Sequence, residues 1–572
     1  MRTGTRCDTS RSWQPRTACQ RHGWADRTTA RGLVLLLIGL TIWRAWIVVH
    51  AGAGLHVDEA QYWAWAQSLD WGYYSKPPAI AALIALSTAW LGDGILGVKA
   101  LAMLCYPLTA WVLFRWIGEV VADVSGPGVA QPARAGRLAA LLFIASPVAG
   151  LLGLAATTDA PLLLAWSLAS YALWRAWRDG RRADWLMLGL WVGLGLMSKY
   201  TMAAFVVSAV GLLVTVPRAR PAGLPLGRGL LIAALAATAC VAPNLAWNAA
   251  HGWPTLRHTA EITVGAQAAP LHETLGTYVV GLLLLVGPVL APWALIWRLG
   301  RPRVDAVKLV PASRCAAAAA ACPTRRDAAF AAAWLSGPLA AIGGLQALHA
   351  QAELNWAAPV LIGAILALVL WLRPEQPGRR LGGWYAALAT QALLLGALTL
   401  AGDIAHALHR PLPRQLDVWA RMRGWEQAFE QLRPAAEAWW RREAGTLAGR
   451  PSGPLVLGAD RAVLANGAYA WRAFSPRWTA WRDAGQPPHD HFQLQSPLEP
   501  GEHPQRILIV SAGAPDPAWR ARLDGPPRRL AIAEVEQTPG RMLHIELWQA
   551  ELASRPMLAQ AARGGRVAAP QP

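Results

Sequence analysis

The feature that most constrains this chain is a series of long apolar runs that recurs from residue 32 to residue 401. A helix needs about 20 mostly apolar residues to cross a bilayer. Runs near that length lie at 32–50, 94–117, 137–156, 160–178, 185–198, 200–217, 229–247, 273–297, 328–348, 356–372 and 381–401. Charged residues make up 15% of the chain, against about 25% in soluble domains, so the sequence predicts a polytopic α-helical membrane protein with about eleven transmembrane helices.

One junction between two runs carries a lysine. The runs at 185–198 and 200–217 form one apolar stretch that is interrupted at Ser198-Lys199-Tyr200. A lysine at the centre of a single spanning helix would cost about 2.5–3.5 kcal/mol on insertion scales. Two shorter spans, with Lys199 at the outer surface, avoid this cost and are therefore predicted.

Arginine alternates between the loops, and it supplies almost all of the formal net charge of +19. The positive-inside rule places the arginine-rich loops in the cytoplasm, together with the basic tail 1–31. An odd number of spans then leaves residues 402–572 outside. Because the arginines are scattered among apolar runs and do not gather on one face, the charge predicts contact with membrane lipids and no nucleic-acid partner.

The chain changes character after the transmembrane region 32–401. Residues 415–446 form a charged helical pattern, and strand-like runs follow at 455–457, 506–510, 530–535 and 542–548, separated by proline and glycine turns. This pattern predicts a small extramembrane α/β domain within 402–572. The region has no glycine-rich nucleotide-binding fingerprint.

The loop after the first run holds the strongest candidate site. It reads GLHVDEAQYWAWAQSLDWGYYSKPP over residues 54–78. A carboxylate at a membrane boundary can accept a proton from a hydroxyl, and a lysine is a compact charge suited to phosphate. We therefore predict that Asp58 and Glu59 are catalytic and that Lys76, fixed before two prolines, binds a phosphate.

Other polar residues are predicted on the same outer side. Asp159 and Lys199 are candidate substrate-binding groups, and Tyr62 and Tyr74 could stack on the face of a sugar. Each has a plainer alternative. Asp159 could start a helix, with Pro161 in the first turn. Lys199 could extend from an apolar surface to the membrane–water interface, and the two tyrosines could belong to an interfacial aromatic belt.

Metal ligands are weakly indicated. His251 and His258 lie in an outer loop and are the candidates. A lone histidine in a loop is more often solvated than bound to metal. No cofactor is therefore firmly predicted, although a divalent metal remains open.

Several segments resemble the family 39 glycosyltransferases, the dolichyl-phosphate-mannose protein mannosyltransferase superfamily. The chain is most similar to the bacterial branch that includes aminoarabinose lipid A transferase. The matching segments of the membrane region are HVDEAQYWAWAQSLDWGYYSKPP (56–78), TTDAPLLLAWSLASYALWRAW (157–177), GLGLMSKYT (193–201), APNLAWNAAHGW (242–253) and ELNWAAP (353–359). The resemblance is weaker after residue 402, where DRAVLANGAYAWR (460–472) and HDHFQL (489–494) match the outer domain of that branch.

The resemblance implies a GT-C fold in a bacterial inner membrane, with the active site facing the periplasm. It also implies inverting transfer of a sugar from a polyprenyl-phosphate donor to a hydroxyl or phosphate of lipid A, another glycan or a protein. Asp58 would be the base or acceptor-orienting group, Asp159 a second acid near the sugar, and Lys76 a ligand of the donor phosphate. Ser75 departs from the pattern, because that branch has a glutamate there that contributes to a metal site.

A transporter or flippase for a lipid-linked sugar is the competing interpretation, since it would also place charges near membrane helices. Carriers usually hold ionisable groups within their spans and are built from repeated halves. This chain places them in loops and has no detectable repeat, which favours the enzyme.

Overall fold

The computed structural model of this chain describes residues 27–125, 131–216, 223–264, 270–299, 323–350, 354–410, 412–413, 416–444, 453–482, 486–498, 505–515, 517–520 and 522–554. The predicted basic tail 1–31 lies outside these residues, apart from its last five positions, which begin the first helix.

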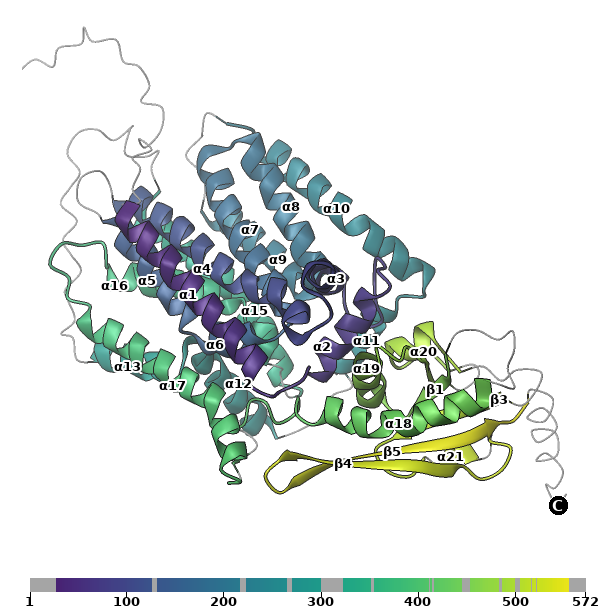
Figure 1. The fold of residues 1–572 in the computed structure, drawn as a ribbon. Helices are drawn as coiled ribbons and strands as arrows, with labels where there is room; N and C mark the ends of the chain where they lie inside the picture. The colour runs from purple at the N-terminus through teal and green to yellow at the C-terminus, as the bar shows by residue number, and fades with distance from the viewer. Residues whose placement is uncertain are drawn as a thin grey trace, which may run out of the picture.

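Helices fill the described part of the region up to residue 407. Their bounds are α1 (Arg27–His50), α2 (Val57–Ala66), α3 (Ala79–Leu91), α4 (Ile95–Ser125), α5 (Pro132–Ile144), α6 (Pro147–Leu151), η1 (Leu152–Leu154), α7 (Asp159–Asp179), α8 (Arg182–Ser198), η2 (Tyr200–Met202), α9 (Ala203–Thr215), α10 (Leu226–Ala250), α11 (Pro254–Val264), α12 (Leu271–Val286), α13 (Leu290–Leu299), α15 (Arg325–Ala347), η3 (Leu354–Ala357), α16 (Val360–Leu372) and α17 (Gly382–Ala407). Figure 1 shows them as one bundle of inclined, mostly long helices.

The predicted apolar runs all coincide with helices, and the chain is a multi-pass membrane protein. Among the described residues, α1, α4, α10, α15 and α17 are long and apolar enough to cross a membrane. Two helix pairs pass the same test together but are bent, α5 with α6 and η1 by 61°, and α12 with α13 by 91°. That makes up to seven spans by this test, fewer than the eleven predicted. One reason is that α8, with 17 residues, is shorter than a full span.

The break predicted at Lys199 is present. Helix α8 ends at Ser198, and Lys199 has an extended backbone with φ −161° and ψ 135° before η2 begins. The chain therefore does not continue as one helix through this lysine.

Helix α3 was not among the predicted runs. It has 13 residues, too few to cross a bilayer, which takes about 20. Pro78 precedes it, and Gly92 ends it with a positive φ of 74°. Trp90, near the end of this helix, is 84% exposed. Tryptophan is common at the membrane–water interface, so α3 is suited to lie there.

The two bends are joined by one buried side chain. The Gln391 Oε1 atom accepts hydrogen bonds from the backbone N–H groups of Val289 (3.2 Å) and Leu290 (3.1 Å) at the start of α13. Its Nε2 atom donates to the carbonyls of Ala145 (2.7 Å) and Val286 (3.1 Å), at the ends of α5 and α12. Gln391 thus satisfies backbone groups that the breaks leave without helical partners.

The region after residue 424 is an α/β domain, as predicted, and is called the outer domain below because it lies beyond one end of the helical bundle. Its elements are α18 (Trp425–Ala444), β1 (Leu455–Gly458), α19 (Arg461–Ala470), β2 (Arg477–Ala480), α20 (His491–Gln495), β3 (Gln505–Ser511), α21 (Pro517–Arg520), β4 (Arg528–Thr538) and β5 (Arg541–Leu552). The strand order is β2-β1-β3-β5-β4, with β1 parallel to β2 and β3, and β5 antiparallel to β3 and β4. Four strands match predicted runs, whereas the four-residue edge strand β2 was not predicted.

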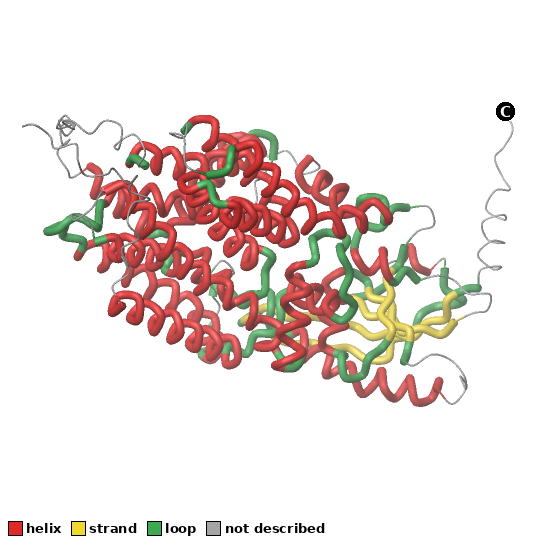
Figure 2. Tube along the Cα trace, turned by 90° about the horizontal axis from the view of Figure 1, so that it is seen from above, coloured by secondary structure: helices red, strands yellow, loops and turns green. Residues whose placement is uncertain are grey.

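This outer domain packs onto the loop that holds the candidate site. Figure 2 shows the strands gathered at one end of the helical bundle, and Figure 1 shows α19 and α20 beside α2 and α11. The rings of Trp63 in α2 and Tyr469 in α19 meet edge to face at 5.2 Å. The Tyr469 hydroxyl donates to the Asp93 carbonyl at 2.9 Å. The outer domain is therefore part of the wall around the site.

Candidate active site

The start of α2 fixes the two adjacent carboxylates. His56 is the N-cap, and its ring accepts a hydrogen bond from the Asp58 N–H, while the Glu59 side chain accepts one from the His56 N–H. This reciprocal capping box sets the direction in which the chain enters the helix. Since consecutive helical residues point about 100° apart, Asp58 and Glu59 face different surroundings.

Glu59 faces the protein interior, with 1% of its surface exposed. Its Oε2 atom lies 2.8 Å from the Lys99 Nζ atom, and Lys99 is equally buried. Its Oε1 atom accepts the Ala156 N–H at 2.7 Å. With both oxygens occupied, Glu59 joins α2 to α4 and to the turn before Asp159. These contacts position the turn before Asp159, and the catalytic role that the sequence predicts for Glu59 stays a prediction.

Asp58 points away from this interior, and its side chain is 44% exposed. Its Oδ1 atom accepts a hydrogen bond from the Arg461 guanidinium, and its Oδ2 atom lies 3.7 Å from the His56 ring. Burial alone would raise the pKa of this carboxyl, but Arg461, His56 and Lys76 outweigh burial and hold the pKa below its usual range. Asp58 is thus an ionised and accessible carboxylate.

Asp159 and Lys199, which the sequence proposed separately as substrate-binding residues, form a second ion pair. Asp159 begins α7, and its Oδ1 atom lies 2.8 Å from the Lys199 Nζ atom. Both residues are buried, with 3% and 5% of their surfaces exposed. The extended backbone at Lys199, between α8 and η2, is what carries its ammonium group to Asp159. The two side chains form a buried ion pair, so Asp159 does more than start a helix.

Lys76 is held in a tight turn. The Tyr73 N–H donates to the Lys76 carbonyl at 3.2 Å, and two prolines follow. Its ammonium forms no ion pair with any side chain that the structure describes. Burial and the neighbouring Lys199 lower its pKa, while Asp58 and Asp159 partly offset this effect. A partly buried cation beside a second cation is a favourable place for an anion.

The end of α10 holds the rest of this loop in place. The Asn244 Nδ2 atom donates to the Trp71 carbonyl at 2.6 Å, and the Trp247 Nε1 atom donates to Asp70 at 2.6 Å. The Tyr200 hydroxyl donates to Asn244 Oδ1 at 2.6 Å. These bonds link the loop to η2, which follows Lys199 directly, and so fix the two lysines relative to one another.

The two predicted tyrosines differ in position. Tyr62 lies one helical turn after Asp58 and is buried; burial raises its pKa well above the usual value, and the charge of Asp58 adds to this. Tyr74 packs its ring at 5.1 Å from the His258 ring. Burial, together with Glu261 and Asp490, raises the pKa of Tyr74 to about 12. Both phenols are therefore neutral hydrogen-bond donors near the charged groups.

The two histidines do not form a metal site with the residues around them. His251 stacks on Trp247 at 4.2 Å, and its Nδ1 atom lies 2.8 Å from the carbonyl of that residue. Burial, Lys76 and Arg461 lower the pKa of His258, which fits a neighbour of cations. Among the described residues, no three His, Cys, Asp or Glu side chains are grouped to hold a metal. With Ser75 in place of the glutamate, the residues present do not fit the metal site of that branch.

Arg461, like Lys99, is a residue of this site that the sequence analysis did not single out. It begins α19 in the outer domain, and besides Asp58 its Nε atom donates to Gln61 Oε1 at 2.5 Å. It lies about 400 residues from its partners, so no local pattern links them. The one available signal was its place in the segment 460–472, which resembles the outer domain of the bacterial branch.

Two sequence comparisons identify known proteins that this chain resembles. Residues 75–247 match the family described as dolichyl-phosphate-mannose-protein mannosyltransferase. The lipid A galacturonosyltransferase RgtD of Rhizobium johnstonii is 28% identical over 495 residues, which cover 85% of this chain and 91% of RgtD.

Two solved structures share the fold. Apo ArnT from Cupriavidus metallidurans superposes with a TM-score of 0.56 at 12% identity, over 91% of this chain and 98% of ArnT. The same protein bound to undecaprenyl phosphate gives 0.53 at 13% identity, with the same coverage. This chain therefore resembles the dolichyl-phosphate-mannose-protein mannosyltransferase family over residues 75–247 and has the GT-C membrane fold that it shares with ArnT.

Proposed function

We propose that this protein is an inverting glycosyltransferase that uses a polyprenyl-phosphate sugar as its donor. The observation that carries the proposal is an accessible, ionised carboxylate, Asp58, near Lys76, a cation that pairs with no carboxylate among the described residues. Transfer from a lipid phosphate requires these two groups, one for the proton of the acceptor and one for the charge on the leaving phosphate.

The reaction balances with residues of this chain. The acceptor hydroxyl or phosphate oxygen attacks the anomeric carbon of the sugar while the bond to the donor phosphate oxygen breaks on the opposite face, which inverts the configuration. The bond electrons leave with the phosphate, whose developing charge Lys76 stabilises. Asp58 accepts the proton of an attacking hydroxyl, and the Asp159–Lys199 pair borders the sugar. No nucleotide is needed.

We further propose that the acceptor is an envelope molecule, with lipid A the first candidate. The named activity of RgtD, a lipid A galacturonosyltransferase, supports this choice, and ArnT has been solved with undecaprenyl phosphate. The arginine-rich loops support an orientation with the site and the outer domain in the periplasm of a bacterial inner membrane. A flippase would not need a surface-facing carboxylate between cations, and it is the less favoured alternative.

Lys76→Ala is expected to weaken use of the polyprenyl-phosphate donor. A charge-assisted hydrogen bond to phosphate contributes about 1.5–3 kcal/mol, so kcat/KM for the donor should fall roughly 10–150-fold. Lys76→Arg should restore part of the loss, since the guanidinium keeps the charge but differs in shape and reach. Donor titration in nanodiscs would measure it. Turnover of Lys76→Ala at the parent rate across all donor concentrations would remove Lys76 as a phosphate ligand.

Arg461→Gln is expected to shift the acidic limb of the pH–rate profile to higher pH. Arg461 favours the charged form of Asp58, so its loss raises the pKa of that carboxyl, and the base is then protonated over a wider acidic range. Arg461→Lys should keep the limb nearer its original position. The pH profile of kcat/KM between pH 4 and 8 gives the position of the acidic limb in the parent and in each variant. His56 and Lys76 also act on Asp58 and remain in both variants, so an unmoved limb in Arg461→Gln would contradict this role.

A further inference from the structure

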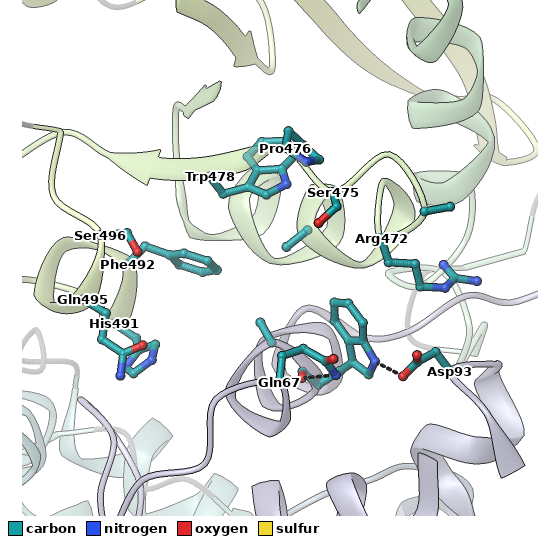
Figure 3. Close-up of a pocket in the computed structure, with 14 residues that line it drawn as sticks. Gln67, Asp93, Arg472, Ser475, Pro476, Trp478, His491, Phe492, Gln495 and Ser496 are labelled. Carbon is teal, nitrogen blue, oxygen red and sulfur yellow. Dashed lines mark hydrogen bonds between the residues drawn. The ribbon is translucent and has the colours of Figure 1, made fainter. Parts of the chain in front are cut away.

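A second site lies on the other side of α2. A cavity of about 580 Å³ separates this helix from the outer domain, and Figure 3 shows its lining side chains. Trp63 and Gln67 contribute from α2 and its C-terminal end, and Trp478, Phe492 and Gln495 contribute from β2 and α20. At 3.6 residues per turn, Gln67 lies about half a turn around the axis from Asp58, so the cavity is distinct from the active site.

The wall of this cavity has the composition of a sugar site. Rings of Trp478 and Phe492 offer flat apolar faces, and Figure 3 shows Gln67 on the opposite side of the open space. Gln67 and Gln495 are both exposed. The Gln67 Nε2 atom donates to the Trp63 carbonyl at 3.3 Å, and Gln495 bonds the His491 ring. A carboxamide has an acceptor oxygen and two donor hydrogens, so each side chain keeps hydrogen-bonding positions for a ligand. Sugar rings need apolar faces for their C–H groups and amides or hydroxyls for their alcohols.

Two polar atoms on the wall have no partner. The Trp478 Nε1 atom and the His491 Nδ1 atom are buried and make no hydrogen bond within the described part of the chain. Burial lowers the pKa of His491 to about 4, so its ring is neutral at physiological pH. A buried polar group without a partner is unfavourable. A hydroxyl-rich ligand at this wall would supply hydrogen-bond partners for both atoms after small shifts of the side chains.

The charged residues of the wall are already occupied. Arg472 donates to Glu426 at 3.2 Å, and its guanidinium lies 4.2 Å from the centre of the Tyr469 ring. Asp93 accepts the Trp63 N–H at 2.8 Å, which Figure 3 marks with a dashed line. The cavity therefore favours a neutral sugar over a phosphate, unlike the cationic surroundings of Lys76.

We propose that this cavity is a subsite for a neutral sugar unit of a glycan-bearing acceptor. The proposal rests on the proposed glycosyltransferase function. Gln67 lies nine residues beyond Asp58, about 13 Å along the axis at 1.5 Å per residue. A short oligosaccharide spans that length, so one acceptor could occupy the subsite with one sugar while another part reaches Asp58. The outer domain would then help to select the acceptor.

The test uses the full chain in nanodiscs and a dephosphorylated oligosaccharide released from lipopolysaccharide, with binding followed by saturation-transfer NMR. The parent is expected to bind it. The double variant Gln67→Ala/Gln495→Ala should bind about 30-fold more weakly, since two neutral hydrogen bonds together contribute about 2 kcal/mol. Gln486→Ala removes an exposed amide outside the cavity and should bind like the parent. In transfer assays, the double variant should raise the acceptor KM and leave kcat and the donor KM unchanged.

Absence of oligosaccharide binding to the parent, or equal binding by the parent and the double variant, would overturn the subsite. The binding measurement needs no donor and no turnover. Its result is therefore independent of the transfer assays. If the proposed glycosyltransferase function is wrong, the Asp58 and Lys76 variants will show it, and the NMR experiment will still report whether the cavity binds the oligosaccharide.

Discussion

Asp58→Asn is expected to reduce sugar transfer by about 10²–10⁴-fold, the usual contribution of a positioned general base. Asparagine keeps the size of the side chain and can still accept a hydrogen bond from Arg461, but it cannot take the proton of the attacking hydroxyl. Because Asp58 is half-exposed and the capping box depends on the side chains of His56 and Glu59, folding should be little affected.

The measurement is single-turnover transfer from a polyprenyl-phosphate sugar to lipid A, with the variant shown to be monodisperse. Asp524→Asn makes the same chemical change at an exposed position in the outer domain and should retain parental activity. Parental activity in a well-folded Asp58→Asn protein would exclude Asp58 as the base and favour a transporter again.

Glu59→Gln is expected to destabilise the protein strongly. It leaves the Lys99 ammonium buried without its counter-ion, and breaking one partner of a buried pair costs about 3–5 kcal/mol. Lys99→Met should have a similar cost, because it leaves the Glu59 carboxylate uncompensated. Thermal unfolding midpoints in detergent, combined with the yield of monodisperse protein, measure both.

The double variant Glu59→Gln/Lys99→Met distinguishes a broken ion pair from general damage to the core. Removing both charges eliminates the uncompensated charge, so the double variant should be more stable than the sum of the two single changes predicts. Strictly additive losses would mean that the pair contributes no coupling. Rescued stability with transfer still impaired would show that transfer needs Glu59 for more than the stability of the ion pair.

Much of the fold was predictable because it depends on local patterns. Long apolar runs predict helices, and a lysine inside one stretch predicts the break that is found after Ser198. Alternating runs after residue 450 predict four of the five strands. The misses have local reasons too: α3 is apolar but too short to qualify as a span, and β2 has only four residues.

The candidate site was predictable in its residue types but not in its pairings. Asp58, Lys76, Asp159 and Lys199 stand out as charges beside apolar runs, and the structure brings them to one region. The partner of Glu59 lies 40 residues away, and that of Asp58 lies about 400 residues away. Such contacts depend on how helices and domains pack, so adjacent carboxylates that look equivalent in the sequence have different surroundings in the fold.

The hydrogen bonds of Gln391 also constrain the order of biogenesis. The N–H groups of Val289 and Leu290 are satisfied by a side chain about 100 residues later in the chain. In hydrocarbon these groups cannot remain without a partner. Until α17 has been synthesised, the 91° elbow between α12 and α13 lacks the hydrogen bonds that Gln391 supplies. The elbow as the structure shows it is therefore complete only when α17 is in place, so a helix late in the described membrane region completes an earlier bend.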